Sequence, residues 1–408
     1  MKVLISNVGS SSLKCQLFQM PEEKVLAKIR VERIGSDKAP VEWAYQDGDI
    51  QKAELAVPNY VSAIQLVLDK LLDHPAGILH SLSDLDVAGF KAGLAEGITG
   101  CRYMDEDVLA AMDEYSSVVA PLHNKIYVQA IRYFRSLLPN SPLVGLFETF
   151  FCQDLPEYDA IYSIPWEWTR KYNIRKTMGH GASMFYVNSR IAELLKRRRE
   201  KINVVQFHLG GSCSLAAVKQ GVNVGGTVCF TTQCGLPCST RASDFDPFLI
   251  PFLVTRGEGT MEEVMDRLLT DGGLSALSGM GFDMRDLQDA ASKGHERAQL
   301  TIDYFVHQTR KYLGIGLVTL GHVDAITFSG GTGESSPHIR RRILENLEEF
   351  GIILDQKKNE KAFRKESKIS PDESKIQIWV VPTNEEIIVA RECVKFLSKT
   401  RDELVDKV

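Results

Sequence analysis

A turn of one glycine and three serines near the start of the chain constrains the fold more than any other sequence feature. Residues 2–8 form an apolar run, and residues 13–18 alternate apolar and polar side chains. This pattern predicts two strands joined by the turn 9–12. Because the turn has no bulky side chain, several N–H and O–H donors can point at one anion. A hairpin with this tip is suited to binding phosphate.

The same pattern returns in the second half of the chain. Residues 204–218 again predict a strand, a Gly-Ser-x-Ser-Leu turn and a strand, and segment 211–215 superposes on 9–13 without a gap, 202 residues later. A third glycine turn, at 330–333, follows an apolar strand and precedes a helix opened by Pro337. Any one such turn is commonly an ordinary tight turn. The three together favour two domains that close on one polyphosphate.

Length and charge limit the function classes. A chain of 408 residues is long enough for two domains, each with its own core. The net charge of −5 argues against broad nucleic-acid binding, and no apolar run reaches membrane-spanning length. The first residues predict a strand rather than a signal peptide. We therefore expect a cytoplasmic protein with small-molecule substrates and no nucleic-acid or membrane partner.

The eight cysteines are spread singly, with no CxxC pair. Cys229, Cys234 and Cys238 invite a metal interpretation, but neither a histidine nor a fourth cysteine lies at a suitable local spacing. Small buried thiols are the better interpretation, and unpaired thiols fit a reducing compartment.

Two irregular stretches mark the organisation of the chain. The first, around residues 156–163, indicates a domain boundary near residue 150. The second is rich in small residues, runs from the 204–218 hairpin to Asp246 and contains Arg241. Loops of this length inside a compact domain are usually functional, so Arg241 becomes a candidate site residue.

Several motifs taken together resemble the acetate kinase family of the actin-like ATPase superfamily. The matching segments are 7–14, 120–124, 180–183, 208–210, 240–247, 283–286, 330–336 and 382–386. The resemblance implies an α/β fold of two actin-like (ribonuclease H-like) domains with an interdomain cleft. It places the first domain at 1–150, with a C-terminal helix at about 386–408 packing back on it, and a nucleotide-binding domain at 151–385.

The resemblance also implies a reaction: reversible transfer of the γ-phosphoryl group of ATP to a short-chain carboxylate, giving an acyl phosphate and ADP. The transition state of such a transfer is loose and carries charge on its equatorial oxygens, so catalysis depends mainly on positioning and charge neutralisation. Mg²⁺ (or Mn²⁺) is the implied cofactor, because it bridges phosphates through few carboxylates. A homodimer is the implied assembly.

The resemblance assigns residues to four roles. The catalytic candidates are His180, Arg241, Glu148 and His123. The metal candidates are Asn7, Glu385 and Glu148. The substrate-binding candidates are Lys91, Gly93, Leu122, Gly179, Thr232 and Arg241. The nucleotide-binding candidates are Ser10, Ser12, Lys14, His208, Gly210, Gly211, Ser212, Asp283, Met284, Arg285, Gly330, Gly331, Thr332, Gly333 and Glu334.

Taken singly, several of these residues have structural explanations. His208 follows apolar residues on a strand and fits a core histidine. Arg241 fits an ion pair with Asp244 or Asp246. Glu385 opens a helix, where a carboxylate stabilises the helix dipole without any further function. Only their joint match to the family favours the functional interpretation.

Three departures from the family pattern fall on candidate residues. Lys91 stands where the family usually has arginine, which keeps the charge but loses the two-pronged grip on a carboxylate. Glu148 stands where the family usually has aspartate. The loop that usually contains Gly-Asn-Gly is Gly210-Gly211-Ser212, so a polar side chain near the phosphates is lost.

The pocket for the acyl group changes as well. Family members usually enclose the methyl group with a valine, an aromatic residue and a proline, where this chain has Gly93, Gly179 and Thr232; Leu122 remains. A pocket emptied in this way loses dispersion contacts with acetate. The sequence therefore predicts a carboxylate larger or more polar than acetate.

Two other functions stay open at this point. One is a catalytically degenerate family member that binds nucleotide as a regulator, which the substitutions at Lys91 and Gly211 make reasonable. The other is a kinase that uses pyrophosphate or inorganic phosphate as donor. The segments around Asp283 and Gly330 favour a nucleoside over such a donor.

Overall fold

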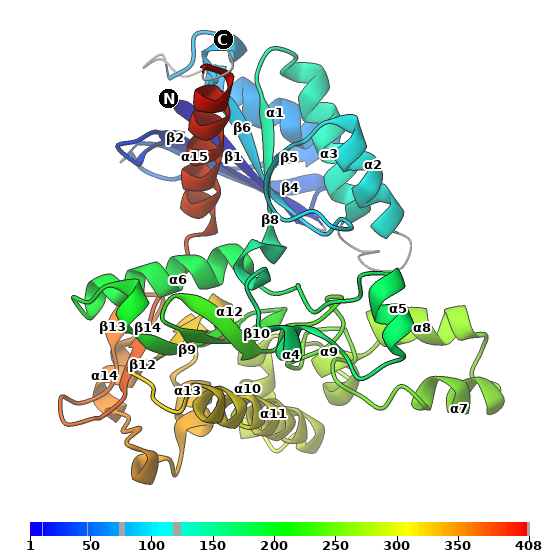
Figure 1. Cartoon of the computed structure of the whole chain (residues 1–408), viewed down its shortest axis with the longest axis vertical. Coiled ribbons are helices and arrows are strands. Elements are labelled where there is room, and N and C mark those ends of the chain that lie inside the picture. Colours follow the sequence, from blue (N-terminus) through cyan, green and yellow to red (C-terminus); the bar gives the residue numbers. More distant parts are fainter. Residues whose placement is uncertain (10, 47, 73–77, 117–123, 406–408) are drawn as a thin grey trace. The chain divides into compact units, whose positions relative to one another are not determined.

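The computed structural model describes residues 1–9, 11–46, 48–72, 78–116 and 124–405, the last five by their backbone alone. The described chain forms two compact units, Met1–Phe150 with Asn384–Val408 (unit 1) and Phe151–Thr383 (unit 2). Each unit is a sheet covered by helices (Figure 1). No helix within the described ranges is both long and apolar enough to span a membrane.

Unit 1 contains a mixed sheet with the strand order β5-β4-β3-β2-β1-β6-β8-β7. Its strands are β1 (Lys2–Val8), β2 (Ser12–Gln19), β3 (Lys24–Glu32), β4 (Ser36–Tyr45), β5 (Gln51–Val57), β6 (Val87–Ala92), β7 (Gly100–Tyr103) and β8 (Leu143–Phe147). Its helices are α1 (Tyr60–Leu72), η1 (Leu82–Asp84), α2 (Glu106–Tyr115), α3 (Asn124–Leu137) and α15 (Glu385–Val405). Strands β1 to β5 pair antiparallel, whereas β1, β6 and β8 are parallel.

Helices cover both faces of the parallel strands of unit 1. Strand β8 is buried throughout and β6 nearly so, as expected for parallel strands between two helix layers. Helices α1 and α3 pack on one face of the sheet, and α15 packs on the other against β1, β6 and β8 (Figure 1). Gly89 permits this close packing, because a Cβ atom there would lie 2.9 Å from Sγ of Cys393 in α15.

Unit 2 repeats the arrangement around a sheet with the order β11-β10-β9-β12-β14-β13. Its strands are β9 (Asn203–Leu209), β10 (Cys213–Lys219), β11 (Val222–Gly226), β12 (Ala325–Ser329), β13 (Ser367–Lys368) and β14 (Gln377–Val380). Its helices are α4 (Glu157–Ala160), α5 (Trp166–Lys171), α6 (Gly181–Leu194), η3 (Arg199–Lys201), α7 (Leu249–Thr255), α8 (Met261–Thr270), α9 (Gly273–Ser278), α10 (Met284–Ser292), α11 (Glu296–Leu320), α12 (Gly330–Ser335), α13 (Pro337–Leu344), η4 (Glu348–Phe350) and α14 (Gln356–Lys361). The short helix η2 (Glu148–Cys152) stands at the junction of the units.

The two sheets share one strand pattern. In each unit three neighbouring strands are antiparallel, and two further strands are parallel to the first of them: β3-β2-β1-β6-β8 in unit 1 and β11-β10-β9-β12-β14 in unit 2. This is a ribonuclease H-like sheet occurring twice. The α/β fold class predicted from the sequence is confirmed.

Both predicted hairpins are present, but their tips differ in length. Beyond the last β1–β2 pair lie the four residues 9–12, whereas beyond the last β9–β10 pair lie the three residues 210–212. The gapless superposition of 9–13 on 211–215 is therefore wrong as a structural equivalence. Strand register follows turn length and geometry, so similar residues in two tips do not ensure the same pairing.

Candidate functional site

The tip of the β9–β10 hairpin and the first residues of β10 contact three groups of candidate residues in unit 2. Gly210 and Gly211 line a pocket. Ser212 contacts Arg241, and Ser214 contacts His180. One short segment of backbone thus fixes the positions of residues that are far apart in the sequence.

Arg241 lies in the irregular loop 227–248, between β11 and α7, and is 8% exposed. Its Nη2 donates to Oγ of Ser212 at 2.7 Å and to Sγ of Cys238 at 3.3 Å. Its Nε is buried and has no hydrogen-bond partner among the described residues. The guanidinium is therefore held in place by neutral groups.

The alternative interpretation, in which Arg241 pairs with a nearby aspartate, is wrong. Oδ1 of Asp244 accepts from the backbone N of Gly235 at 2.7 Å, and its Oδ2 accepts from the Tyr312 hydroxyl. Oδ1 of Asp246 accepts from the backbone N of Phe248 at 2.9 Å. Arg241 forms no ion pair within the described part of the chain. A buried guanidinium with an unpartnered Nε and no acidic partner is a candidate for binding an anion.

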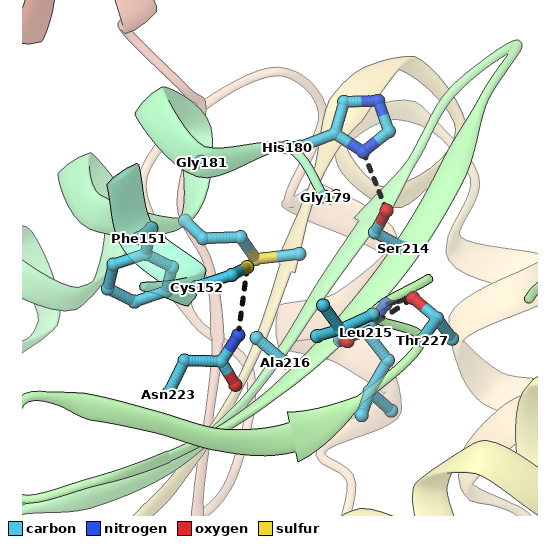
Figure 2. Close-up of a pocket in the computed structure, with 12 residues that line it drawn as sticks. Phe151, Cys152, Gly179, His180, Gly181, Ser214, Leu215, Ala216, Asn223 and Thr227 are labelled. Atoms are coloured by element: carbon cyan, nitrogen blue, oxygen red, sulfur yellow. Dashed lines mark hydrogen bonds between the residues drawn. The ribbon is translucent and has the colours of Figure 1, made fainter. Parts of the chain in front are cut away.

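Two histidines of unit 2 stack on each other. The rings of His180, just before α6, and His208, in β9, have centroids 4.1 Å apart and planes 12° apart. Nδ1 of His180 lies 2.8 Å from Oγ of Ser214 (Figure 2), and Nδ1 of His208 lies 2.8 Å from Oγ of Ser183. Each ring is thus oriented by a serine. The sequence analysis assigned no role to either serine, although Ser183 lies in the first turn of the helix that follows His180.

A pocket of about 160 Å³ in unit 2 collects many of the predicted nucleotide-binding residues. From that set, the lining residues are Gly210, Gly211, Asp283, Met284, Arg285, Gly331 and Thr332. The sequence analysis missed the lining residues Phe282, Gln288, Ser335, Ser336 and Arg364. An exposed aromatic ring at Phe282 and a guanidinium at Arg364, beside bare glycine backbone, suit an aromatic and anionic ligand.

Three further predicted residues do not line the pocket but belong to α12, the helix that carries the lining residues Gly331 and Thr332: Gly330, Gly333 and Glu334. Gly330 has φ +76°, and a Cβ there would lie 2.8 Å from the carbonyl oxygen of Leu209, so only glycine fits. Oε1 of Glu334 accepts from the backbone N of Gly330 at 2.9 Å and of Thr383 at 3.3 Å. Burial raises the pKa of Glu334, and these hydrogen bonds only partly oppose it. Glu334 therefore has a structural role as an acceptor for two backbone N–H groups, and its role in nucleotide binding stays a prediction.

A cluster of charges lies at the carboxyl ends of the parallel strands of unit 1. Nζ of Lys91, in β6, is 2.7 Å from Oε2 of Glu385, the first residue of α15, and 3.9 Å from Oε1 of Glu148, which follows β8. Burial alone would lower the pKa of Lys91, but the two carboxylates outweigh it and hold that pKa well above its ordinary value. The half-buried Tyr127 adjoins the cluster, and burial raises the pKa of its phenol. Lys91 is therefore protonated, and the two carboxylates neutralise its positive charge.

The implied divalent cation fits the chemistry of this cluster. No group of three or more His, Cys, Asp or Glu side chains in the described residues is arranged to hold a metal ion. Mg²⁺ does not require such a cage, because it commonly takes one or two carboxylates and completes its shell with water and phosphate oxygens. Asn7, in β1, together with Glu148 and Glu385 offers oxygen donors of that kind.

The tip of the β1–β2 hairpin is closed by its own backbone. The N–H of Gly9 donates to the carbonyl of Ser12 at 2.8 Å, and the Tyr60 hydroxyl donates to the carbonyl of Gly9. Lys14 is exposed on β2. The predicted site residues Ser10, Leu122 and His123 lie outside the described residues.

The three positions predicted to empty the acyl pocket differ from one another. At Gly93 the prediction is wrong: a Cβ there would lie 2.2 Å from Oδ1 of the fully buried Asn124, which already fills the space. At Gly179 a Cβ would meet only Sγ of Cys152, at 3.7 Å, beside a cavity of about 10 Å³ next to His180 (Figure 2). Thr232 is half-buried, and its hydroxyl accepts from the side chain of Gln233 at 3.1 Å. A Cβ therefore has space at Gly179 but not at Gly93, and the cavity beside Gly179 is about the size of one water molecule.

The ribonuclease H-like sheet that occurs in both units, together with the pocket lined by Gly210, Gly211 and Gly331, defines an α/β protein of the actin-like class. Residues 2–391 match the acetokinase family, and the chain therefore belongs to that family. It is 39% identical over 395 residues to an acetate kinase of Geobacillus sp. (strain WCH70), covering 97% of this chain and 98% of that protein. An acetate kinase of Thermoanaerobacter pseudethanolicus is also 39% identical, over 399 residues, with 97% and 99% of the two chains covered.

Solved structures agree with this assignment. The crystal structure of Porphyromonas gingivalis acetate kinase superposes with a TM-score of 0.85 at 31% identity, covering 97% of this chain and 99% of that one. A propionate kinase from Francisella tularensis gives a TM-score of 0.86 at 29% identity, with 96% and 98% covered.

Proposed function

We propose that the protein is an ATP-dependent carboxylate kinase that reversibly transfers the γ-phosphoryl group of ATP to a short-chain carboxylate, giving an acyl phosphate and ADP. Membership of the acetokinase family supports the carboxylate kinase class. The observation that carries the proposal is the buried guanidinium of Arg241, which has no acidic partner in the described structure. It is held by the same hairpin tip whose glycines line the pocket.

Unit 2 supplies groups suited to phosphoryl transfer. Gly210 and Gly211 line the pocket without side chains, so the phosphates of a nucleotide can approach the backbone closely there. Arg241 is suited to grip the carboxylate or the transferring phosphoryl group at two points. His180, oriented by Ser214, is suited to stabilise the equatorial oxygens as a hydrogen-bond donor.

From unit 1 we propose Asn7, Glu148 and Glu385 as the residues that hold Mg²⁺ (or Mn²⁺). When bound, the ion supplies neutralisation of the phosphate charge. Lys91 keeps the cationic charge of the family's usual arginine and neutralises part of the carboxylate pair. We also propose the homodimer that the resemblance implies, which size-exclusion chromatography with light scattering tests.

We propose further that the preferred acid is larger or more polar than acetate. The missing side chain at Gly179, where a Cβ would meet only Sγ of Cys152, and the hydroxyl of Thr232 support this, whereas Gly93 does not. The test compares kcat/KM for acetate, longer acids and hydroxylated acids in the wild-type protein, Gly179→Phe and the matched control Gly179→Ala. We expect wild type and Gly179→Ala to prefer the larger or hydroxylated acids, and Gly179→Phe to shift toward acetate. A wild-type preference for acetate over every other acid contradicts the proposal.

Hydroxylamine trapping of the acyl phosphate tests the enzyme class. We expect hydroxamate only when ATP, Mg²⁺ and a carboxylate are all present. The ion pair between Lys91 and Glu385 is the observation that supports the alternative of a catalytically degenerate regulator. That alternative predicts nucleotide binding without hydroxamate. The alternative donor predicts hydroxamate from pyrophosphate or phosphate and none from ATP. The aromatic and basic lining at Phe282 and Arg285 argues for a nucleoside donor.

A further inference from the structure

Two histidines and two serines of unit 2 form a crossed set of contacts between α6 and the sheet. His180 precedes α6 and Ser183 lies in its first turn, whereas His208 in β9 and Ser214 in β10 are directly opposite each other on neighbouring strands. Nδ1 of His180 lies 2.8 Å from Oγ of Ser214, and Nδ1 of His208 lies 2.8 Å from Oγ of Ser183. Each of the two hydrogen bonds therefore connects the helix segment to the sheet.

The stacking of the two rings couples their orientations. Their centroids are 4.1 Å apart and their planes differ by 12°, so the two faces are in van der Waals contact. Neither ring can turn far about its Cβ–Cγ bond unless the other turns with it. Ser183 is fully buried and Ser214 is 8% exposed, so water does not readily replace either hydroxyl. The orientation of His180 therefore depends on Ser183 as well as on Ser214, although the hydroxyl of Ser183 is bonded to the other ring.

The hydrogen bond at Nδ1 also determines where a neutral imidazole carries its proton. A serine hydroxyl can donate or accept, and where it donates to Nδ1 the ring proton stays on Nε2. Figure 2 shows the second ring nitrogen of His180 on the side of the ring away from Ser214. A proton held on that nitrogen can be donated to an oxygen of a phosphoryl group, which is the role proposed for His180 above.

We propose that Ser183 and Ser214 are positioning residues that hold His180 and His208 as neutral rings with the proton on Nε2. Ser214 acts on His180 directly, and Ser183 acts on His180 through the stacked ring of His208. The effect on catalysis rests on the proposed carboxylate kinase activity. The place of the ring protons, in contrast, is a property of the protein without substrates.

Nitrogen NMR of the histidine rings tests the place of the protons without any turnover. The ¹⁵N shift distinguishes a protonated ring nitrogen from an unprotonated one, and His180→Gln and His208→Gln assign the signals. At pH about 8, well above the ordinary pKa of histidine, we expect both wild-type rings to carry the proton on Nε2. In Ser214→Ala the His180 signals should become those of mixed tautomers. In Ser183→Ala the signals of both histidines should change.

A serine elsewhere in α6 provides the matched control. The hydroxyl of Ser189 donates to the backbone carbonyl of Phe185 at 3.0 Å, so Ser189→Ala removes a hydroxyl from the same helix without removing a partner of either ring. We expect the ring signals of both histidines and the value of kcat to stay as in wild type.

Steady-state kinetics measures the consequence for phosphoryl transfer. In Ser214→Ala and in Ser183→Ala we expect kcat to fall about tenfold while KM for ATP and for the acid stays within about twofold, because a donor to the transition state is misaligned and ground-state binding is kept. Ser214→Thr keeps the hydroxyl on a strand, where a β-branched residue is well tolerated, and should recover most of kcat.

Three outcomes overturn the proposal: the wild-type His180 ring carries a proton on Nδ1, its signals stay unchanged in Ser183→Ala, or kcat falls as far in Ser189→Ala as in Ser183→Ala. A wild-type protein that forms no hydroxamate would contradict the proposed kinase function instead, and the NMR result would still decide whether the serines position the two rings.

Discussion

Each unit buries one cationic side chain among its candidate site residues, and the two units balance that charge in opposite ways. Lys91 of unit 1 lies 2.7 Å from one carboxylate and 3.9 Å from another. Arg241 of unit 2 has only neutral partners in the described structure, the hydroxyl of Ser212 and the thiol of Cys238. Both side chains are mostly buried, with Lys91 16% and Arg241 8% exposed.

The difference distinguishes two kinds of buried charge. A buried ion pair is compensated within the protein and needs no ligand, although removing one partner leaves the other charge exposed to a low dielectric. A buried guanidinium without an acidic partner gains stability when an anion arrives. We therefore propose that unit 2 binds the anion at Arg241, and that a cation binds in unit 1 only by taking the place of Lys91 between the carboxylates.

The largest expected effect is the loss of Arg241. In Arg241→Ala, hydroxamate formation should fall about 100- to 1,000-fold, because removing one preorganised donor to a developing anion costs that much. Arg241→Lys keeps the charge but loses the bidentate hydrogen bonding of the guanidinium, so it should recover only a small part of the rate. Steady-state kinetics with ATP and the best carboxylate checks both variants; an Arg241→Ala rate within threefold of wild type contradicts the assignment.

Lys91 provides the opposite test, in which stability is the main readout. Lys91→Ala leaves Glu148 and Glu385 without the cation between them, and we expect the free energy of unfolding to fall by about 3 kcal/mol. Lys91→Arg keeps the charge and serves as the control. Urea unfolding followed by circular dichroism measures the change. A loss below about 1 kcal/mol, as for a solvent-exposed pair, would show that the cluster is not a buried ion pair.

A variant of Ser212 tests the comparison between Arg241 and Lys91 more finely, because Ser212 is a neutral partner of Arg241 where Lys91 has acidic partners. Ser212→Ala removes the hydroxyl that accepts from Arg241, a hydrogen bond to a charged group worth about 1.5 kcal/mol or more, so we expect about a tenfold loss of kcat/KM. Ser212→Thr keeps a hydroxyl and should restore most of the activity. Equal losses in the two variants would indicate that the tip backbone, rather than the hydroxyl, positions Arg241.

The smallest effect is the pH dependence of Glu334. The pKa of Glu334 is raised by burial above its ordinary value of 4.5, so the folded state binds this proton more tightly than the unfolded state. The stabilisation is complete below the ordinary pKa and is lost as pH rises through the folded pKa. Glu334→Gln keeps an acceptor for the N–H of Gly330, and we expect it to flatten this part of the Tm against pH curve. An unchanged curve contradicts the shift.

Part of the molecule follows directly from sequence patterns. The hairpins, the helix opened by Pro337 and the doubled α/β arrangement are predicted correctly, because strand alternation and helix starts are local signals. The predicted glycine turn 330–333 is wrong, because these residues begin the helix α12 (Gly330–Ser335) directly after β12. The irregular loop with Arg241 is recognised by its length alone. Whether the assigned site residues act as proposed stays a prediction.

What the sequence could not supply depends on contacts between distant residues. Asn124 fills the space at Gly93 from a helix 31 residues later in the chain, so a glycine there does not mean a cavity. Ser183 and Ser214 become partners of the histidines only once α6 and β10 are packed. The tip lengths of the two hairpins are set by register, which the matching Gly-Ser residues conceal.

We propose, as the central claim, that Arg241 rather than Lys91 is the cation that binds the transferring phosphoryl group of ATP. Thermal unfolding of wild type, Arg241→Ala and Lys91→Arg with adenosine and with ATP tests it most directly, because a ligand that binds only the folded state raises Tm. We predict that Arg241→Ala keeps the shift caused by adenosine and loses the additional shift caused by ATP, while Lys91→Arg keeps both. An undiminished ATP shift in Arg241→Ala would contradict the account.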